Sequence, residues 1–321
     1  MRIVFLIVSG LERPAGHRYF QIARELVRRG HRVRLLALHP DLPSCRERRF
    51  RRDGVEVWYV GQMHARKSAS NPTRFGPLEL LGVLVRSTLG MVWGVICSPA
   101  DAYHLGKPQP VNGLAALLGV ALIRRRRFYV DCDDDEVQSN RLTAGWQRAV
   151  FGFWQWLLPA LAAGATVNTE FMRRRLARRG IGPLAWVPNG VDPARFRAPA
   201  PAALEALRAA LGLAGRRVVA YVGTLALQNH PVDLLLDSFA LLAGELPDVD
   251  LLLVGGGEDL GELRRRAAAA GLAGRVLFAG QIPQASVPAY LALASLSVDP
   301  VNDDDVARAR WPLKVAESLA L

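Results

Sequence analysis

The chain has 321 residues, half of them hydrophobic, and at this length two domains are the usual arrangement. Its 29 glycines and 20 prolines are scattered between apolar runs, which excludes collagen-like, low-complexity and coiled-coil proteins. The net charge of +12 favours anionic partners such as phosphorylated substrates or a membrane surface. No nucleic-acid-binding motif accompanies this charge, and runs such as 46–52 and 124–127 are equally compatible with plain solvated faces.

The three cysteines, Cys45, Cys97 and Cys132, lie far apart without a CxxC pair. This spacing excludes a zinc knuckle and a disulfide framework, and it fits the reduced cytoplasm. The first ten residues form a short apolar run with no signal-peptide cleavage site after it, so they predict a buried first strand.

The segment 77–98 is the one that raises the question of a membrane. It is largely apolar, but Glu79, Arg86 and three glycines interrupt it too often for a spanning helix. It predicts an amphipathic helix that lies either in the plane of a membrane or packed on the domain. Peripheral contact with the anionic inner face of a membrane is therefore one of two open interpretations.

Apolar, β-branched runs alternate with stretches of helical period along the chain. Unbroken apolar strands separated by helices indicate parallel sheets covered on both faces. A first helix at 17–29 ends at Gly30, a typical C-cap residue. The strands predicted in the first half are 2–8, 32–38, 55–60, 102–105, 128–132, 165–168 and 185–187.

A second series follows the Pro/Ala-rich stretch 197–203, so we predict domains at 1–190 and 191–321. The last helix begins at Pro312 and reaches the end of the chain. Because doubly wound domains usually have five or six strands, we expect this second domain to be incomplete. Its predicted strands are 217–222, 250–254, 276–278 and 296–298, and its helices are 204–211, 232–243, 260–270 and 287–294.

Ligands of open parallel sheets bind at the carboxyl ends of the strands, so the turns there are the first candidates. After the first strand, Gly10 and Gly16 permit close backbone approach, and Gly16-His17 opens a helix whose N-terminus attracts anions. The alternative is an ordinary strand-to-helix turn.

Five acidic residues occupy six positions, 131–136, directly after a predicted strand. Asp131 and Asp133 are candidates for a Mg²⁺ or Mn²⁺ site, or for general-base contact with a sugar hydroxyl. Asp134 and Asp135 are instead predicted to cap the following helix.

In the second series, Gly223 would let a phosphate approach the backbone, and Gly255 repeats this arrangement one strand later. Lys314 and Glu317 share one face of the last helix. They form either a surface ion pair, or contacts from Lys314 to a phosphate and from Glu317 to a ribose.

Five blocks of sequence together are specific: 187–192 (VPNGVD), 221–223 (YVG), 253–257 (LVGGG), 276–280 (VLFAG) and 312–317 (PLKVAE). With these blocks the chain resembles the family 4 glycosyltransferases of GT-B architecture over nearly its whole length. The resemblance implies an α/β fold with two Rossmann-like doubly wound domains facing across a cleft. It also implies a nucleotide diphosphate sugar as co-substrate, a glycan or lipid-linked acceptor, retention of anomeric configuration, and no metal or other cofactor.

Several site residues follow from the resemblance alone. Glu317 matches the glutamate that holds the donor ribose, and Gly16 matches the glycine-rich loop near the acceptor and diphosphate. The base-binding segment corresponds to Gly280, Gln281 and Ile282.

The chain departs from the family pattern at three places. Thr224 and Asn229 stand where the family has an Arg and a Lys on the diphosphate, which leaves Lys314, His230 or a further arginine as candidate replacements. Ala309 stands where the first glutamate of the family's Glu-x7-Glu motif falls, and Asp303–Asp305 are candidates for its work. Asp133 lies in the region where the family often has a histidine.

The sequence therefore predicts a glycosyltransferase. Two alternatives remain open: a non-catalytic sugar-nucleotide or glycan-binding module of the same fold, and a sugar-nucleotide epimerase.

Overall fold

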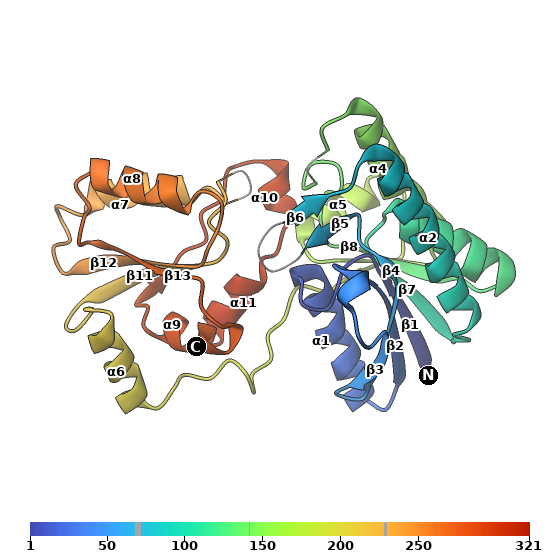
Figure 1. Cartoon of the computed structure of the whole chain (residues 1–321), viewed down its shortest axis with the longest axis horizontal. Coiled ribbons are helices and arrows are strands. Elements are labelled where there is room, and N and C mark those ends of the chain that lie inside the picture. Colours follow the sequence, from blue (N-terminus) through green and yellow to red (C-terminus); the bar gives the residue numbers. More distant parts are fainter. Residues whose placement is uncertain (68–71, 141, 228–229) are drawn as a thin grey trace. The chain divides into compact units, whose positions relative to one another are not determined.

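Two separate parallel sheets organise the chain in the computed structural model, which describes residues 1–67, 72–140, 142–227 and 230–321. One unit comprises Met1–Pro188 with Arg308–Trp311, and the other comprises Asn189–Ala307 with Pro312–Leu321. Each is a Rossmann-like α/β unit, which confirms the predicted fold class (Figure 1).

The sheet of the first unit has the strand order β10-β9-β8-β7-β1-β2-β4-β3. Its strands pair in parallel except at the β3 edge, where β3 (Arg49–Arg52) runs antiparallel to β4. Part of the 46–52 arginine run is therefore an edge strand whose three arginines are exposed. Their charges discourage pairing with a further strand. The other strands are β1 (Arg2–Ile7), β2 (Arg32–His39), β4 (Val55–Gln62), β7 (Ala102–Gly106), β8 (Phe128–Cys132), β9 (Ala165–Val167) and β10 (Leu184–Trp186).

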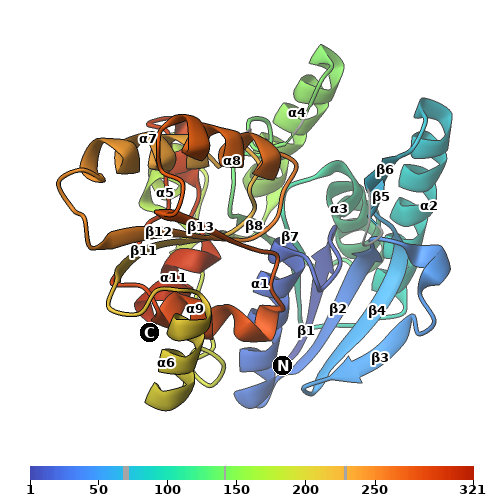
Figure 2. The same cartoon turned by 60° about the vertical axis from the view of Figure 1, so that its left-hand side comes forward.

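Helices cover both faces of this sheet because alternate strand residues point to opposite sides. Phe5 and Ile7 pack with α1 (Pro14–Arg28), whereas Val4 and Leu6 belong to the core on the other face. Figure 2 shows α1 on one side of the sheet and α2 and α3 on the other. The helices of the second face are α2 (Pro77–Ile96), α3 (Pro110–Ala115) with its continuation η2 (Ala116–Ile123), α4 (Gly145–Leu161) and α5 (Glu170–Ala177).

Besides β3, three short elements of the first unit were not predicted. A 3-10 turn, η1 (Leu42–Ser44), follows β2. A separate antiparallel pair is formed by β5 (Ala65–Lys67) and β6 (Pro72–Arg74).

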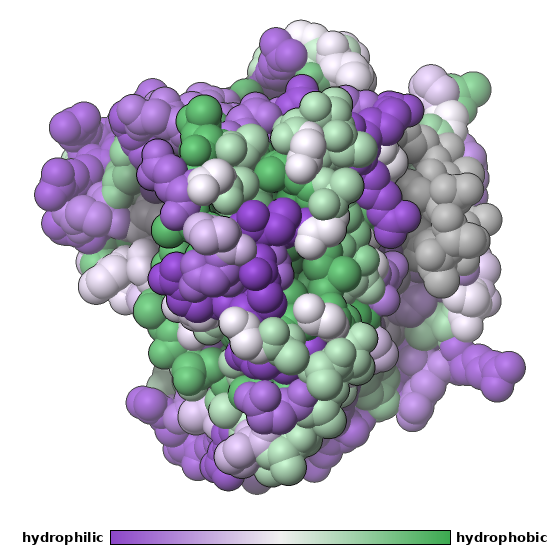
Figure 3. Space-filling model, turned by 90° about the vertical axis from the view of Figure 1, so that its left-hand side faces the viewer, coloured by the Kyte–Doolittle hydropathy of each residue, from purple (hydrophilic) through white to green (hydrophobic). Residues whose placement is uncertain are grey.

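The sheet of the second unit has the order β13-β12-β11-β14, and all of its described pairs are parallel. Leu251 and Leu253 point into the core on one face, while Leu252 and Val254 point into the core on the other. On the side of this unit that Figure 3 shows, hydrophilic and hydrophobic residues lie interspersed. Its elements are α6 (Pro201–Ala210), β11 (Arg217–Val222), α7 (Val232–Leu242), β12 (Val249–Val254), α8 (Leu260–Ala269), β13 (Val276–Gly280), η3 (Gln284–Ser286), α9 (Val287–Ala292), β14 (Leu296–Ser297), α10 (Asp305–Ala309) and α11 (Leu313–Leu319).

Candidate functional site

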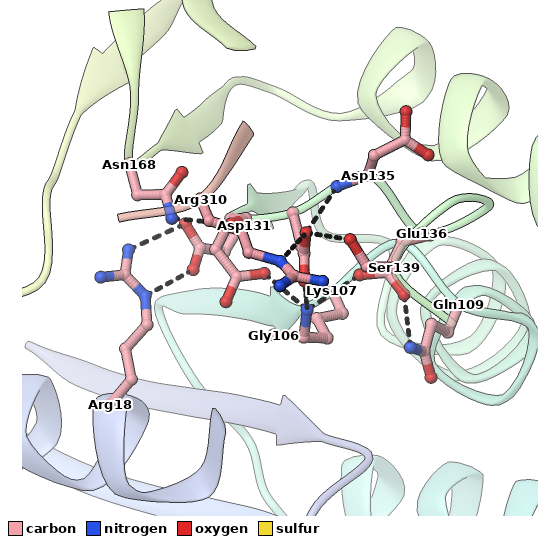
Figure 4. A network of polar contacts seen from close by, with 12 residues as sticks. Arg18, Gly106, Lys107, Gln109, Asp131, Asp135, Glu136, Ser139, Asn168 and Arg310 are labelled. Carbon is pink, nitrogen blue, oxygen red and sulfur yellow. Dashed lines mark hydrogen bonds and ion pairs between the residues drawn. The ribbon is translucent and has the colours of Figure 1, made fainter. Parts of the chain in front are cut away.

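Asp131, at the carboxyl end of β8, is fixed by donors from two elements, α1 and β9, and Figure 4 shows its pair with Arg18 of α1. Its carboxylate accepts hydrogen bonds from Arg18 Nε at 3.0 Å, Tyr19 Oη at 2.9 Å and Thr166 Oγ1 at 2.5 Å. Burial by itself would raise the pKa of Asp131, but the charge and hydrogen bonds of Arg18 outweigh it and hold that pKa below its usual value. Asp131 is thus an ionised and enclosed carboxylate.

Arg18 reaches from α1 to the end of the sheet and is itself almost completely buried. Besides its pair with Asp131, its guanidinium donates to the backbone oxygen of Val187 at 2.8 Å. One buried cation therefore joins α1, β8 and the segment after β10. A buried charge is tolerated where it is paired in this way.

Lys107 is the cation at the centre of the acidic run. Its Nζ lies 2.9 Å from Asp133 Oδ1 and 3.0 Å from Glu136 Oε1. Burial opposes its charge, but the surrounding carboxylates raise its pKa well above the usual value. The backbone of Lys107 has φ +97°, a conformation that residues other than glycine rarely adopt. Such strain concentrates at functional sites.

Asp133 differs from Asp131 in its protonation. Burial raises the pKa of the Asp133 carboxyl to about 6, with Lys107 acting against burial and the neighbouring Asp131 charge acting with it. The carboxyl thus titrates close to neutral pH, where a group can both accept and release a proton. Asn168 Nδ2 donates to the backbone oxygen of Asp133 at 2.6 Å and holds this segment at the end of the sheet.

The remaining acids of the run have structural partners. Asp135 accepts from the backbone amides of Val137 and Gln138 and pairs with Arg175 at 2.6 Å. It therefore caps a turn, and the prediction that it caps a helix is wrong because α4 begins only at Gly145. Among the described residues, no three His, Cys, Asp or Glu side chains are arranged to hold a metal ion.

The β1–α1 loop is packed around its glycines. A side chain at Gly16 would overlap the backbone of Gly10, and one at Gly10 would approach Pro40. Because α1 begins at Pro14, Gly16 and His17 lie within its first turn, and Gly16 does not open the helix as predicted. The glycines let the loop fold back on itself at the end of β1.

A mostly apolar hollow is lined by residues of α1 and β1 and by the Arg18–Asp131 pair. Its volume is about 260 Å³, and His104 and Thr166 are among its few polar lining residues. Burial lowers the pKa of His104, so the ring is neutral near pH 7. An apolar hollow of this kind does not match a sugar, which needs many hydrogen-bond partners.

In the second unit, the loops after β11, β12 and β13 meet backbone to backbone. Gly223 donates to the oxygen of Val254, and Gly255 donates to the oxygen of Gly280, both at 2.9 Å. Gly255 has φ +144°, and a side chain there would overlap the Gly223 oxygen. Gly255 was predicted to let a phosphate approach the backbone. The structure shows that it also allows the two loops to pack closely.

Lys314 of α11 lies against the Gly223 turn. Its Nζ is 2.5 Å from Asp299 Oδ1 and 4.3 Å from the ring centroid of Tyr221. The Tyr221 hydroxyl donates to the backbone oxygen of the exposed Thr224 at 2.9 Å and so fixes the turn. Burial raises the pKa of Tyr221, which stays protonated and can donate.

Asp299 is a site residue that the sequence analysis missed. The available signal was its position two residues after the last strand of the second sheet, β14. The acids predicted for this part of the site were Asp303–Asp305. Of these, Asp304 caps α10, since its carboxylate accepts from the Ala307 amide at 2.8 Å.

The other predicted donor residues lie near these loops or outside the described part. His230 just precedes α7, and its backbone amide donates to Ala226 at 3.1 Å. Gln281 and Ile282 follow β13, with Gln281 exposed and Ile282 packed on the core. Asn229 is not among the described residues.

Glu317 and Ala309 differ in what they can offer a ligand. Burial raises the pKa of the half-buried Glu317, and Arg195 opposes this rise. Ala309 is completely buried in the core of the first unit, and the next residue, Arg310, places its Nε 3.8 Å from Asp134 Oδ1. The position that holds the first glutamate in the family therefore offers only a buried methyl group.

Two doubly wound units, each with charged groups at the carboxyl edge of a parallel sheet, define a protein of the GT-B class of glycosyltransferases. The chain belongs to the glycosyltransferase family described as "Glycosyl transferase 4-like domain", whose model matches residues 15–190. Residues 216–321 match the model described as "Glycosyl transferases group 1". The resemblance inferred from the sequence is thereby confirmed.

Curated relatives of the chain are named as enzymes that transfer different sugars. It is 36% identical, over 42% of its length, to a GDP-mannose-dependent alpha-(1-6)-phosphatidylinositol monomannoside mannosyltransferase of Mycolicibacterium smegmatis. It is 30% identical, over 67% of its length, to a 2-deoxystreptamine glucosyltransferase of Streptomyces kanamyceticus. The matches cover 35% and 52% of these two relatives, so the chain spans about half of their length or less.

Solved structures show the same fold at low sequence identity. Sucrose-phosphate synthase from Thermosynechococcus elongatus superposes with a TM-score of 0.67 at 18% identity, covering 94% of this chain and 77% of that one. Anabaena Alr3699/HepE, solved in complex with UDP-glucose, superposes with a TM-score of 0.62 at 20% identity, covering 93% and 73%.

Proposed function

We propose that this protein transfers a sugar from a nucleotide diphosphate sugar to a hydroxyl of a glycan or lipid-linked acceptor, as a step of glycan biosynthesis. Membership of the glycosyltransferase family supports the reaction class. The relatives named as a GDP-mannose-dependent mannosyltransferase and as a glucosyltransferase support a nucleotide sugar as donor.

The observation that carries the proposal is the position of Lys314 at the Gly223 turn. The Lys314 ammonium lies 3.3 Å from the position that a Cβ atom on Gly223 would occupy. The backbone of the turn and the ammonium are therefore close together. A diphosphate leaving group gains charge as the glycosidic bond breaks, and a fixed cation stabilises that charge. Lys314 would thus do the work of the cations that Thr224 and Asn229 lack.

The second unit would also hold the nucleoside. Glu317, on the same helix as Lys314, would accept hydrogen bonds from the ribose hydroxyls, for which it must be ionised. The backbone of Gly280, Gln281 and Ile282 would meet the base. His230, before α7, would lie near the phosphates, where the helix N-terminus favours negative charge.

The first unit would act on the reacting sugar or the acceptor through Asp133. Its pKa of about 6 suits a group that accepts a proton from a hydroxyl near neutral pH. Asp131 would position the end of β8 through its pair with Arg18, and it would not exchange a proton itself. The Gly10–Gly16 loop and His17 would line the acceptor and diphosphate side.

Two finer statements rest on the family resemblance. We propose that the anomeric configuration is retained and that no metal ion or other cofactor takes part. The cations assigned to the leaving diphosphate are then those of the protein itself. Turnover that persists in the presence of a chelator, with a product of the same anomeric configuration as the donor, is the expected result.

A thermal-shift screen with UDP, GDP, ADP and their common sugars tests the donor class. A ligand at about 100 times its dissociation constant adds about 2.7 kcal/mol to the free energy of unfolding, a clear rise in Tm. We expect one nucleotide to produce this rise, Glu317→Gln to abolish it, and the exposed control Glu245→Gln to keep it. Transfer to an added acceptor should then follow with the same donor.

The outcomes separate the alternatives. Absence of a shift with every nucleotide would overturn the donor assignment. A shift without transfer or hydrolysis would indicate a binding module. Release of free nucleoside diphosphate without any acceptor would point to an epimerase.

A further inference from the structure

The helices on one face of the first unit carry exposed apolar side chains in rows. On α2 these side chains recur every three or four residues, which places them along one side of the helix. Monomeric soluble proteins rarely expose apolar residues in such continuous groups. We call this surface the α2–α4 face; it comprises Leu78, Leu81, Val85, Leu89 and Trp93 of α2, Leu114, Leu118, Leu122 and Ile123 of α3–η2, and Trp146, Val150 and Phe153 of α4.

The opposite side of α2 is firmly packed on the sheet. Ser87, Met91, Gly94 and Val95 are buried, and a side chain at Gly90 would overlap the backbone oxygen of Val60. Within the described residues, α2 is the one helix long and apolar enough to cross a membrane. Because the glycines bring it against β4, α2 lies along the unit with its apolar row outward, and it does not span a bilayer in this fold.

The three helices form one continuous surface. Gly119 of η2 lies against Val95 of α2, where a side chain at Gly119 would begin 3.1 Å from Val95 Cβ. Gly113 of α3 lies directly under Trp154 of α4. Small residues at both junctions let the helices approach closely, so their outer rows adjoin.

The charges around this face have one dominant sign. The helices and the turn after η2 contain Arg86, Arg148 and the run 124–127, against a single acid, Glu79. Arg124 donates to the backbone oxygens of Val95 and Ile96, which holds the arginine run at the C-terminal end of α2. Arg125, Arg126 and Arg127 are exposed there.

We propose that the α2–α4 face docks on the surface of an anionic lipid bilayer, with its leucines and tryptophans in the interface and the 125–127 arginines on lipid phosphates. An apolar row beside a cluster of basic residues is the pattern of helices that lie in the plane of a membrane. Anionic headgroups attract each basic residue near the surface. This docking is independent of the proposed transfer reaction.

Co-sedimentation of the whole chain with vesicles tests the proposal. We expect binding to vesicles of phosphatidylcholine and phosphatidylglycerol in equal parts, and much weaker binding to phosphatidylcholine alone. The double variant L81D/L89D should reduce the partition coefficient by roughly tenfold or more, because charges would enter the interface. The matched control is L241D, which changes an exposed leucine of α7 in the second unit.

A second variant tests the charge independently of the apolar row. Replacement of Arg125, Arg126 and Arg127 by Gln should weaken binding by roughly fivefold for each arginine, and about 0.5 M NaCl should have a similar effect on the wild type. Circular dichroism and Tm should match those of the wild type, since the changed side chains are exposed.

Two results would overturn the proposal. One is a wild-type chain that stays in the supernatant with anionic vesicles. The other is L81D/L89D binding as tightly as L241D. A dimer that L81D/L89D dissociates in lipid-free solution, without vesicle binding by the wild type, would assign the face to a second copy of the chain.

Discussion

The ammonium of Lys107 lies 2.9 Å from the carboxylate of Asp133, although the strand that precedes Lys107 and the strand that precedes Asp133 are separated by a whole helix in sequence. Parallel neighbours β7 and β8 end at the same edge of the sheet, which brings these residues together. This pair allows the acidic residues 131–136 to lie together in the interior, because adjacent carboxylates repel one another without a cation.

Removal of the central cation should therefore destabilise the first unit. We expect Lys107→Met to lower the free energy of unfolding by about 3–5 kcal/mol, since Asp133 and Glu136 would be left buried without their cation. Urea unfolding followed by circular dichroism measures the change. Arg173→Met, which breaks an exposed pair with Glu170, is the matched control and should have little effect. Equal effects of the two substitutions would contradict the central role of Lys107.

Asp133 should make stability depend on pH. Its folded pKa of about 6 lies above the usual 3.8, so the folded chain holds this proton more tightly. The stabilisation is complete below about pH 4 and is lost as the pH rises through 6. The Asp133→Asn variant has no carboxyl to ionise here, so it does not lose this stability. The difference in free energy of unfolding, variant minus wild type, should therefore rise by about 3 kcal/mol between pH 4 and 7. Chemical unfolding at several pH values measures the difference, and parallel profiles would show that Asp133 has an ordinary pKa.

The Arg18–Asp131 pair should behave as one unit. Arg18→Met or Asp131→Asn alone leaves a buried partner uncompensated, so each should cost about 3–5 kcal/mol. The double variant should cost less than the sum of the two by roughly 2 kcal/mol, because the second change removes the group that the first left unpaired. A double-mutant cycle by equilibrium unfolding gives this coupling. Simple additivity would mean that the two side chains do not interact.

Asp299 should compete with a bound phosphate for the Lys314 ammonium. We expect Lys314→Met to weaken binding of the preferred nucleoside diphosphate by about tenfold or more, since charge-assisted hydrogen bonds are strong. Asp299→Asn should leave binding unchanged or tighter, because the carboxylate no longer competes with phosphate for the ammonium. Isothermal titration calorimetry on both variants and on Lys314→Arg distinguishes the roles. Weaker binding in Asp299→Asn would show that Asp299 positions Lys314.

Gly255 should tolerate no side chain. Gly255→Ala would place a methyl group into the Gly223 oxygen at φ +144°, and we expect a loss of roughly 3 kcal/mol or more. Gly244→Ala is the matched control, because nothing lies within 4 Å of its added carbon. Thermal unfolding of the two variants gives the comparison, and equal Tm values would contradict the loop packing described for β11 and β12.

Most strands could be predicted because they carry a local signal. Runs such as 128–132 and 217–222 are apolar and bounded by turns, and the structure has strands there. The β3 strand was missed because three of its four residues are arginines, a pattern without apolar alternation. Its pairing depends on β4, a partner that periodicity alone does not reveal.

The sequence by itself determined the order of most elements, the parallel sheets and the glycosyltransferase family, since these depend on local periodicity and on motifs of contiguous residues. Only the tertiary structure decided the partners: Lys107 for Asp133, Arg18 for Asp131 and Asp299 for Lys314. Each pair joins residues that are distant in sequence. The physical reason is that a buried charge takes its partner from whichever strand or helix the fold places beside it, and a linear pattern does not encode that neighbour.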